Sequence, residues 1–481
     1  MQKIIKPGFT ILIILCALKA AASGAIISGY YPSLKEGDIV TLTATAYGDP
    51  NFPEFLKVYH TKIKNHAFRF VIPARNAPIK IFIIFSDKLD KLTGTNQYIR
   101  KKVQGFYLEK GDDIVITEYG GKVRYSGRGS AKFKVLQQIR GFEHDAFSPL
   151  GTSFIGNPLL NFHIADSLIQ KQLAFLQAKK NLLSGHMYTI YKANLFGGWI
   201  GRNYMVRYVP DSARESVINE LKTTYFRQPF DNKDREKIDD SPAIIYADRY
   251  ASSIRLKYEF DSCYAANAAF SDHNYYRFLK KNYSGKLLER LVADMLFRDR
   301  VEPGDNSGLI NDALTWVKNQ DFRIVLSNLK SHRAPGAKAF EFSFSDDQGQ
   351  MHTMDEFKGK IVFIDFWFTG CGNCIQVTPF IKHLEGYFQQ KPVVFLSINI
   401  DNTKEEWLKS IQTGKYTTKL GTNLFSGGNG LNSPISKYYS VDAGPTLILI
   451  DQSGKIMATP LDPRDDNGKS LIAQIDGALR N

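Results

Sequence analysis

The stretch from Ile361 to Pro379, IVFIDFWFTGCGNCIQVTP, constrains the fold more than any other part of the chain. It begins with a seven-residue run that is apolar or β-forming except for Asp365, which is typical of a buried parallel strand. The turn Thr369-Gly370 follows, and an apolar-periodic segment then runs from Ile375 to Phe388. The pattern predicts a strand, two cysteines in a CxxC motif, and a helix, in that order.

This order places Cys371 at the first turn of a helix, where unpaired backbone N–H groups and the helix dipole favour a negative charge. A thiolate carries such a charge and is the attacking species in thiol-disulfide exchange. Cysteines of CxxC motifs at helix N-termini have pKa values of about 3.5 to 7.5, below the ordinary value of about 8.5. The spacing lets Cys374 lie one helical turn behind and resolve a mixed disulfide.

The CxxC motif has two other interpretations. A zinc half-site also uses CxxC, but it needs two further Cys or His ligands, and the chain has no second CxxC and no HxxxH. We therefore predict no metal site. Two buried structural cysteines fit the composition but not the context of strand, turn and helix. The residues favour redox chemistry.

The segment FIDFWFTGCGNC resembles the active-site segment of the thioredoxin superfamily. Ala334-Pro335, followed by FSFSDDQGQ and FKGKIVFIDFW, resembles the TlpA/ResA-like thiol-disulfide oxidoreductases. The resemblance covers Ala334 to Asn481, about a third of the chain. It implies an α/β thioredoxin-like domain in which Cys371 and Cys374 form a redox-active disulfide.

The resemblance also assigns roles to single residues. The three expected catalytic residues are Cys371, Cys374 and Asp365. Asp365 falls at the position of the superfamily's buried acid, where it is expected to have a raised pKa and to act as the general base. Pro379 falls at the helix-kinking proline, and Pro445 at the cis-proline that faces the cysteines. The residues expected to face the substrate are Trp367, Phe368, Gly372, Asn373, Gly444 and Pro445.

Three positions depart from the superfamily pattern. Gly370 stands where a tryptophan usually precedes the first cysteine, and Asn373 stands where a proline usually separates the two. Ser397 stands where thioredoxins have a lysine that pairs with the buried acid. Without that cation, Asp365 is expected to ionise less readily.

Residues 1–25 have the features of a secretory signal peptide. Lys3 and Lys6 supply positive charge, Phe9 to Leu18 form a short apolar centre, and Ala20-Ala21-Ala22 resembles a cleavage site. The alternative is an uncleaved anchor, but the apolar run is shorter than the ~20 residues of a membrane span. We predict cleavage near Ala22 and, from the resemblance, a periplasmic or other extracytoplasmic location.

The chain has 62 Lys and Arg against 48 Asp and Glu, a net charge of +14. The basic residues are spread out, with only short doublets such as Lys101-Lys102 and Lys280-Lys281. No dense basic run or RNA-binding signature occurs, so we predict no nucleic-acid partner. Weak peripheral contact with anionic lipid head groups is a by-product that such a surface allows.

The length of 481 residues allows two to four domains at about 100 to 200 residues each. After the signal we predict a β-sandwich-like domain at 26–129, because short β-rich runs alternate with Gly, Pro and Asp. Residues 130–333 are predicted to be a helical region and linker, and 334–481 the thioredoxin-like domain, with a long loop at 417–433. Cys263, the odd thiol of the mature chain, is expected to be buried.

Together these features predict an extracytoplasmic thiol-disulfide oxidoreductase that exchanges thiols through its CGNC pair, with reduction as the favoured direction. Its substrates would be protein thiols or disulfides, and the resemblance adds a membrane electron donor, with cytochrome c maturation as one candidate pathway. No cofactor is predicted, because the cysteine pair stores two electrons. The alternative is a secreted ligand- or partner-binding protein in which the thioredoxin-like module is accessory.

Overall fold

The computed structural model describes residues 24–48, 52–73, 75–85, 102–120, 122–150, 158–203, 214–219, 240–264, 266, 268–298, 307–441 and 443–480. The predicted signal segment therefore lies outside the described residues except for its last two positions. Internal contacts divide the chain into two compact units, unit 1 with residues 1–49 and 55–268 and unit 2 with residues 50–54 and 269–481. The predicted helical region, 130–333, is thus shared between the two units.

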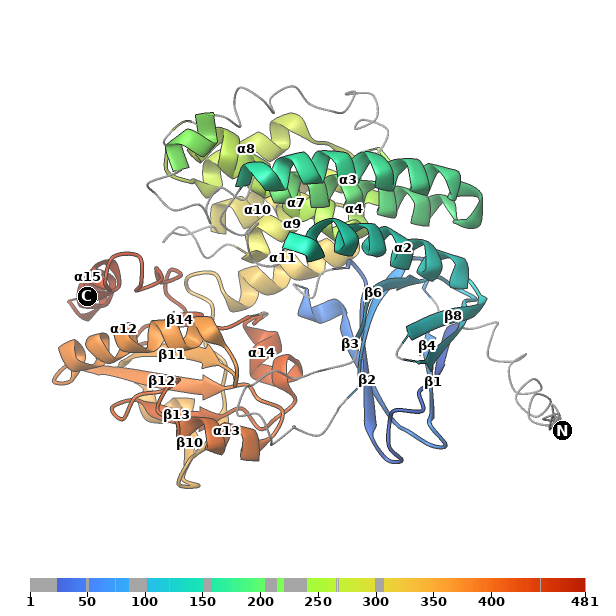
Figure 1. Ribbon diagram of the computed structural model, residues 1–481. Coiled ribbons are helices and arrows are strands. Elements are labelled where there is room, and N and C mark those ends of the chain that lie inside the picture. Colours follow the sequence, from blue (N-terminus) through green and yellow to red (C-terminus); the bar gives the residue numbers. More distant parts are fainter. Residues whose placement is uncertain are drawn as a thin grey trace. The chain divides into compact units, whose positions relative to one another are not determined.

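The N-terminal part of unit 1 is β-rich, as predicted, and its strands form two separate four-stranded sheets (Figure 1). The first has the order β4-β1-β7-β8. Its strands are β1 (Gly24–Tyr30), β4 (Ala67–Pro73), β7 (Asp113–Tyr119) and β8 (Lys122–Arg128). The second has the order β3-β2-β5-β6. Its strands are β2 (Ile39–Thr45), β3 (Leu56–Lys62), β5 (Ile79–Phe85) and β6 (Lys102–Leu108).

Alternating burial along the strands builds the core of these sheets. In β5 the side chains of Ile79, Ile81, Ile83 and Phe85 are buried and those between them are half-buried. Buried side chains from both sheets belong to one apolar cluster, which also includes Phe133. Each fully buried aliphatic or aromatic side chain contributes about 1.5–3 kcal/mol relative to an exposed one.

Helices complete unit 1. Their bounds are α2 (Ser130–Phe147), α3 (Pro158–Ala178), α4 (Gly185–Asn203) and α7 (Asp248–Glu259). Helix α2 contacts β6, β7 and β8 (Figure 1). A Cβ on Gly197 would lie 2.4 Å from the backbone of Arg249 and Tyr250, so only glycine allows α4 and α7 to approach this closely. Cys263 is a free, buried cysteine in the π-helical segment Phe260–Tyr264, as expected.

Unit 2 begins with α8 (Asp272–Asn282), α9 (Gly285–Arg298), α10 (Ser307–Trp316) and α11 (Gln320–His332). The side chain of Ser271 caps α8 and that of Asn319 caps α11, which fixes where these helices start. Phe52 packs against Phe297 and Phe322, with ring centroids 5.5 and 6.1 Å apart. These aromatic contacts connect Phe52 to α9 and α11, in agreement with its place in unit 2.

The C-terminal part of unit 2 is a mixed six-stranded sheet with helices, in the order β10-β9-β13-β12-β11-β14. The strands are β9 (Ser343–Asp346), β10 (Met351–Thr353), β11 (Ile361–Trp367), β12 (Val393–Asn399), β13 (Thr422–Phe425) and β14 (Thr446–Ile450). The helices are α12 (Gly372–Phe388), α13 (Lys404–Ile411), α14 (Pro434–Tyr438) and α15 (Lys469–Leu479). Strand β11 pairs in parallel with β12 and antiparallel with β14, and every one of its residues is buried.

One prediction for this sheet is wrong. Residues 417–433 were expected to form a long loop, yet Thr422–Phe425 within them form β13, which pairs in parallel with β12. Four residues of mixed polarity carry no strand pattern by themselves, and it is the neighbouring strands β9 and β12 that fix their conformation.

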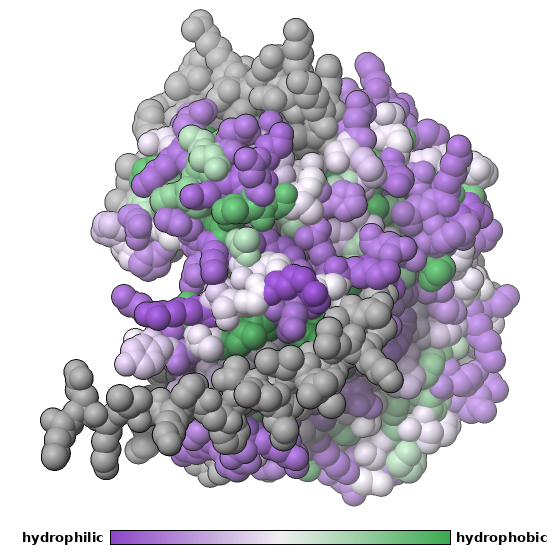
Figure 2. Space-filling model, turned by 90° about the vertical axis from the view of Figure 1, so that its right-hand side faces the viewer, coloured by the Kyte–Doolittle hydropathy of each residue, from purple (hydrophilic) through white to green (hydrophobic). Residues whose placement is uncertain are grey.

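The surface is mostly hydrophilic where it is coloured on the face that Figure 2 shows, and its hydrophobic spots are small and separate. Large exposed hydrophobic residues occur singly, for example Tyr119 and Leu182. Within the part of the chain that the structure describes, no helix combines the length and the apolar character needed to cross a membrane.

Candidate active site

The two cysteines lie where β11 passes into α12. Cys371 is the N-cap residue of α12, and its Sγ accepts a hydrogen bond of 3.1 Å from the backbone N–H of Cys374. The two residues form a disulfide. Cys371 is 5% exposed and Cys374 is fully buried. The predicted order of strand, CxxC and helix is confirmed, and it places Cys371, the more exposed residue of the pair, at the positive end of the helix dipole.

The loop before β14 contacts the disulfide directly. A Cβ built on Gly444 would lie 2.7 Å from Sγ of Cys374 and 3.1 Å from Sγ of Cys371, so no larger residue fits there without displacing a sulfur. The peptide bond from Gly444 to Pro445 is cis, as the resemblance implied. The backbone of this loop therefore lies against both sulfurs.

The structure places most of the expected substrate-facing residues at the surface around the disulfide. Gly372 and Asn373 are exposed, and Phe368, Gly444 and Pro445 are half-buried. Trp367 differs from this expectation. It is 0% exposed and stacks on Tyr416 with ring centroids 5.0 Å apart, so its ring supports the site from inside and does not face a substrate.

Asp365 lies in the middle of β11, 3% exposed, and its Oδ1 has no hydrogen-bond partner in the described part of the protein. Across the sheet its register partner is Ser397, at the position where thioredoxins have lysine. Burial raises the pKa of Asp365 to about 7. The carboxyl group can therefore gain or lose a proton near neutral pH.

A second buried acid shares a small cavity with Asp365. Glu385 of α12 and Thr378, one turn after Cys374, line this cavity, which at about 10 Å³ has room for about one water molecule. Oε1 of Glu385 accepts a hydrogen bond of 2.6 Å from Oγ1 of Thr418. Burial raises the pKa of Glu385. Glu385 was not predicted as a site residue, although its spacing of four residues from buried Ile381 places it on the apolar face of the helix.

Polar contacts hold the loop that precedes Cys371. Asp401 accepts hydrogen bonds from the backbone N–H of Thr369 (2.8 Å), the hydroxyl of Thr369 (2.6 Å) and the amide group of Asn399 (2.9 Å). The backbone N–H of Gly370 donates to the hydroxyl of Tyr416 at 3.0 Å. Asp401 and Tyr416 were not predicted as site residues, because their sequence positions give no sign that they meet this loop.

We expect Asp401→Asn to loosen the active-site loop. The new amide group would face two donors, and leaving buried hydrogen-bonding groups unpaired costs about 1–3 kcal/mol. Hydrogen exchange measured on peptides containing Thr369 and Gly370 should be roughly tenfold faster or more than in the wild type, the factor that about 1.4 kcal/mol provides. Asp347→Asn, at an exposed turn, is the matched control. Unchanged exchange in Asp401→Asn would contradict this role.

Among the described residues, no group of three or more His, Cys, Asp and Glu side chains is placed to hold a metal ion. The site therefore offers a disulfide, a buried acid and a backbone surface. This set of groups can exchange a disulfide with two thiols and move a proton, which is what thiol-disulfide exchange needs.

Comparisons with known proteins agree with this chemistry. A family model described as thioredoxin-like matches residues 359–456. The protein ResA, a thiol-disulfide oxidoreductase, from Geobacillus thermodenitrificans is 29% identical over 127 residues, which are 26% of this chain and 69% of the relative. The ResA protein of Bacillus thuringiensis subsp. konkukian is 30% identical over 122 residues, 25% of this chain and 66% of the relative.

Among solved structures, a Bacteroides vulgatus protein assigned as a thiol-disulfide oxidoreductase is 29% identical, covers 31% of this chain and 99% of its own, and has a TM-score of 0.27. The matches cover the C-terminal part of the chain, and these relatives are named thiol-disulfide oxidoreductases. The chain is thus multidomain, with a β-rich N-terminal part, a helical middle and a thioredoxin-like domain that resembles ResA.

Proposed function

We propose that this chain, whose C-terminal part is a thioredoxin-like domain similar to ResA, is an extracytoplasmic thiol-disulfide oxidoreductase that acts on protein thiols and disulfides, with reduction as the favoured direction. One observation carries the proposal. A disulfide between Cys371 and Cys374 lies at the N-terminus of α12, and the backbone of Gly444 contacts both sulfurs. Substrate backbone can approach the sulfurs along this loop, because Gly372 and Asn373 beside it are exposed.

In the reductive direction the cycle begins with both cysteines reduced. The thiolate of Cys371 attacks one sulfur of the substrate disulfide, that S–S bond breaks, and the departing sulfur leaves as a thiolate that takes up a proton. Cys371 and the substrate are then joined in a mixed disulfide. Cys374 loses its proton and attacks Sγ of Cys371, which releases the second substrate thiol and forms the Cys371–Cys374 disulfide. Two electrons have passed to the substrate.

Asp365 is the proposed base for Cys374. It lies on β11 beneath α12, and burial raises its pKa to about 7, so that it can accept a proton near neutral pH. Because Ser397 stands at the position where thioredoxins have a lysine, no cation at that position of the sheet opposes protonation of Asp365. Glu385, in the same small cavity, would take the proton onward from Asp365.

The reduction potential of the Cys371–Cys374 pair tests the direction. Exchangers of this chemistry range from about −270 mV for a reductant to about −120 mV for a strong oxidant. For a reductase we expect equilibrium with glutathione or dithiothreitol buffers to give a value in the lower half of this range. A value near the upper end would contradict the reductive direction and make the chain an oxidase.

The predicted signal peptide supports an extracytoplasmic location, and the pair would then need a membrane electron donor to become reduced again, with cytochrome c maturation as one candidate pathway. Weak contact with anionic lipids follows from the net charge of +14. We also propose that the two N-terminal sheets, whose side chains share one core, form a β-sandwich at 26–129, followed by a helical region and linker at 130–333 and the thioredoxin-like domain at 334–481.

A further inference from the structure

Unit 1 contains a pocket that the proposed exchange reaction does not use. It lies among β5, β6 and the helices α2, α3, α4 and α7, and its volume is about 70 Å³. Part of its lining is apolar and is formed by Leu136, Ile139, Leu168, Ile169, Leu195 and Trp199. Charged side chains also belong to the lining. A pocket with an apolar wall and a few convergent polar groups is the usual form of a small-molecule site.

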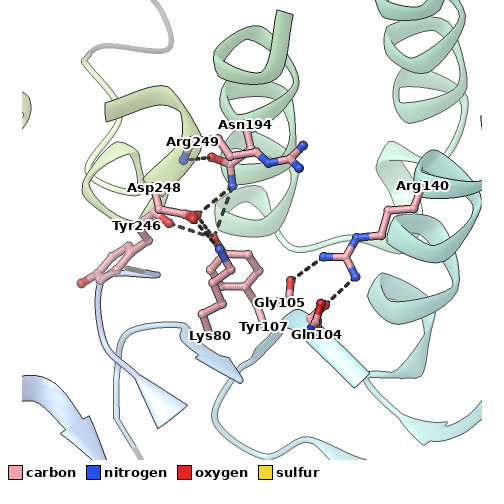
Figure 3. A network of polar contacts seen from close by, with 9 residues as sticks. All are labelled: Lys80, Gln104, Gly105, Tyr107, Arg140, Asn194, Tyr246, Asp248 and Arg249. Atoms are coloured by element: carbon pink, nitrogen blue, oxygen red, sulfur yellow. Dashed lines mark hydrogen bonds and ion pairs between the residues drawn. The ribbon is translucent and has the colours of Figure 1, made fainter. Parts of the chain in front are cut away.

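One of the cations in this pocket is already neutralised. Lys80 forms an ion pair with Asp248, the first residue of α7. Oδ1 of Asp248 also accepts hydrogen bonds from the hydroxyl of Tyr107 (2.9 Å) and the amide of Asn194 (3.5 Å) (Figure 3). The charges of Lys80 and Asp248 therefore balance one another, and this pair adds no net charge to the pocket.

Three arginines in the lining share a single carboxylate. Glu143 forms an ion pair with Arg202, and its other oxygen lies 3.9 Å from Nη1 of Arg249. Arg140 has no carboxylate within ion-pair distance in the part of the protein that the structure describes. The lining therefore has two more positive charges from arginine than negative charges from Glu143.

Arg140 is held in place without being neutralised. Its guanidinium donates to the carbonyl oxygens of Gln104 and Gly105, the latter at 3.1 Å, and lies 4.9 Å from the ring centroid of Phe106. Gly105 has φ of +63°, and a Cβ there would lie 2.9 Å from Nη2 of Arg140, so glycine makes room for the guanidinium. The contacts fix the orientation of Arg140 and leave part of its donor fork free.

Burial and the nearby charge of Arg249 lower the pKa of Arg140, and Tyr191, Tyr125 and Glu143 oppose this shift only in part. The side chains of Arg140, from α2, and Arg249, from α7, extend toward one another (Figure 3). A negative charge between them would remove their mutual repulsion. A guanidinium fork that is fixed and partly desolvated binds a carboxylate strongly, because the planar groups match and little side-chain entropy is lost.

We propose that this pocket binds a small organic carboxylate, with the carboxylate group at Arg140 and Arg249 and the apolar part against Ile139 and Trp199. The apolar part of the lining disfavours a strongly hydrated ion such as inorganic phosphate, because that ion would lose water without gaining polar contacts from it. The site is independent of the cysteine pair, so it would make unit 1 a ligand-binding part of the chain.

Calorimetric titration of the mature chain with butyrate and benzoate tests the proposal. We expect saturable binding of at least one acid at millimolar concentrations or below, and at least tenfold weaker binding of the neutral amides butyramide and benzamide. Arg140→Met should weaken binding of the acid at least tenfold. Lys134→Met removes a charge from an exposed position of the same helix and should leave binding unchanged.

Arg249→Ala provides a second variant in case Arg140→Met disturbs β6. Its side chain is 58% exposed, so its removal should weaken binding without loss of folding. Four results would overturn the proposal. They are no saturable binding of either acid, equal binding of acid and amide, preference for inorganic phosphate over both acids, and unchanged affinity in both folded arginine variants. Thiol-disulfide exchange should be the same in all these variants, which separates this test from that of the cysteine pair.

Discussion

Cys371→Ser is expected to reduce disulfide reductase activity to the uncatalysed background, a loss of more than roughly 10³-fold, because a serine hydroxyl at this position cannot form a mixed disulfide. Cys371 is the more exposed cysteine and lies at the N-terminus of α12, so it is the sulfur that a substrate meets first. Reduction of a protein disulfide by the mature chain, with dithiothreitol as the electron source, measures the effect.

Cys374→Ser should give a different result. The variant can still attack through Cys371, but without the resolving sulfur it should accumulate a mixed disulfide with the substrate, which mass spectrometry detects. Cys263→Ser is the control, since Cys263 is a free cysteine of unit 1, outside the thioredoxin-like domain, and it should keep wild-type activity. Full activity of both Cys371→Ser and Cys374→Ser would exclude the proposed exchange reaction and favour the binding alternative.

Asp365→Asn should stabilise the thioredoxin-like domain above neutral pH. Burial raises the pKa of Asp365 to about 7 in the folded protein, whereas an unfolded chain has a value of roughly 4. The protonated carboxyl therefore contributes stability that is fully present below about pH 4, declines between about pH 4 and pH 7, and is lost above pH 7. Between pH 4 and pH 7 the free energy of unfolding of the wild type should fall by roughly 4 kcal/mol because of Asp365, and the neutral amide of the Asn variant should cause no such fall.

The variant and the wild type should thus unfold at similar urea concentrations at about pH 4, and the variant should require more urea at about pH 8. A brief hydrogen-exchange pulse after each urea step, read on peptides from β11, reports unfolding of this domain alone. Asp347→Asn, an exposed substitution, should show no such pH dependence. If Asp365→Asn and the wild type respond to pH in the same way, Asp365 does not carry a raised pKa.

The same variant separates the role of Asp365 in the reaction from its effect on stability. If Asp365 accepts the proton of Cys374, Asp365→Asn should slow release of the second substrate thiol by about 10²-fold or more, while formation of the mixed disulfide by Cys371 stays close to the wild-type rate. Single-turnover experiments resolve the two steps. Equal effects on both steps would mean that Asp365 acts only on the structure of the site.

Local sequence determined the elements that carry the chemistry. An apolar run interrupted only by Asp365 fixed β11 as a fully buried strand, and the glycine and cysteine residues after it fixed the start of α12. Asp365 could be recognised because a charged residue in the middle of a buried strand must have an unusual environment. The general division into β-rich, helical and thioredoxin-like parts followed from periodicity and from the resemblance in residues 334–481.

The remaining features depend on contacts between residues far apart in the sequence, which no local pattern contains. Tryptophan is a residue type that often occurs in binding sites, but Trp367 is buried and its ring stacks on Tyr416. Asp401 and Glu385 join the site only because β12 and α12 bring them beside the active-site loop and the cavity below it. The strand β13 exists because its neighbours supply its hydrogen bonds.

The sequence by itself determined that two sulfurs would lie at the start of a helix, because both the strand and the helix are set by residues next to one another. Only the tertiary structure decided which backbone lies against those sulfurs, which acids are buried beneath them, and that Arg140 lacks a carboxylate partner in the described part of unit 1. The physical reason is that burial and charge compensation are properties of the assembled fold, since each depends on atoms contributed by several distant segments.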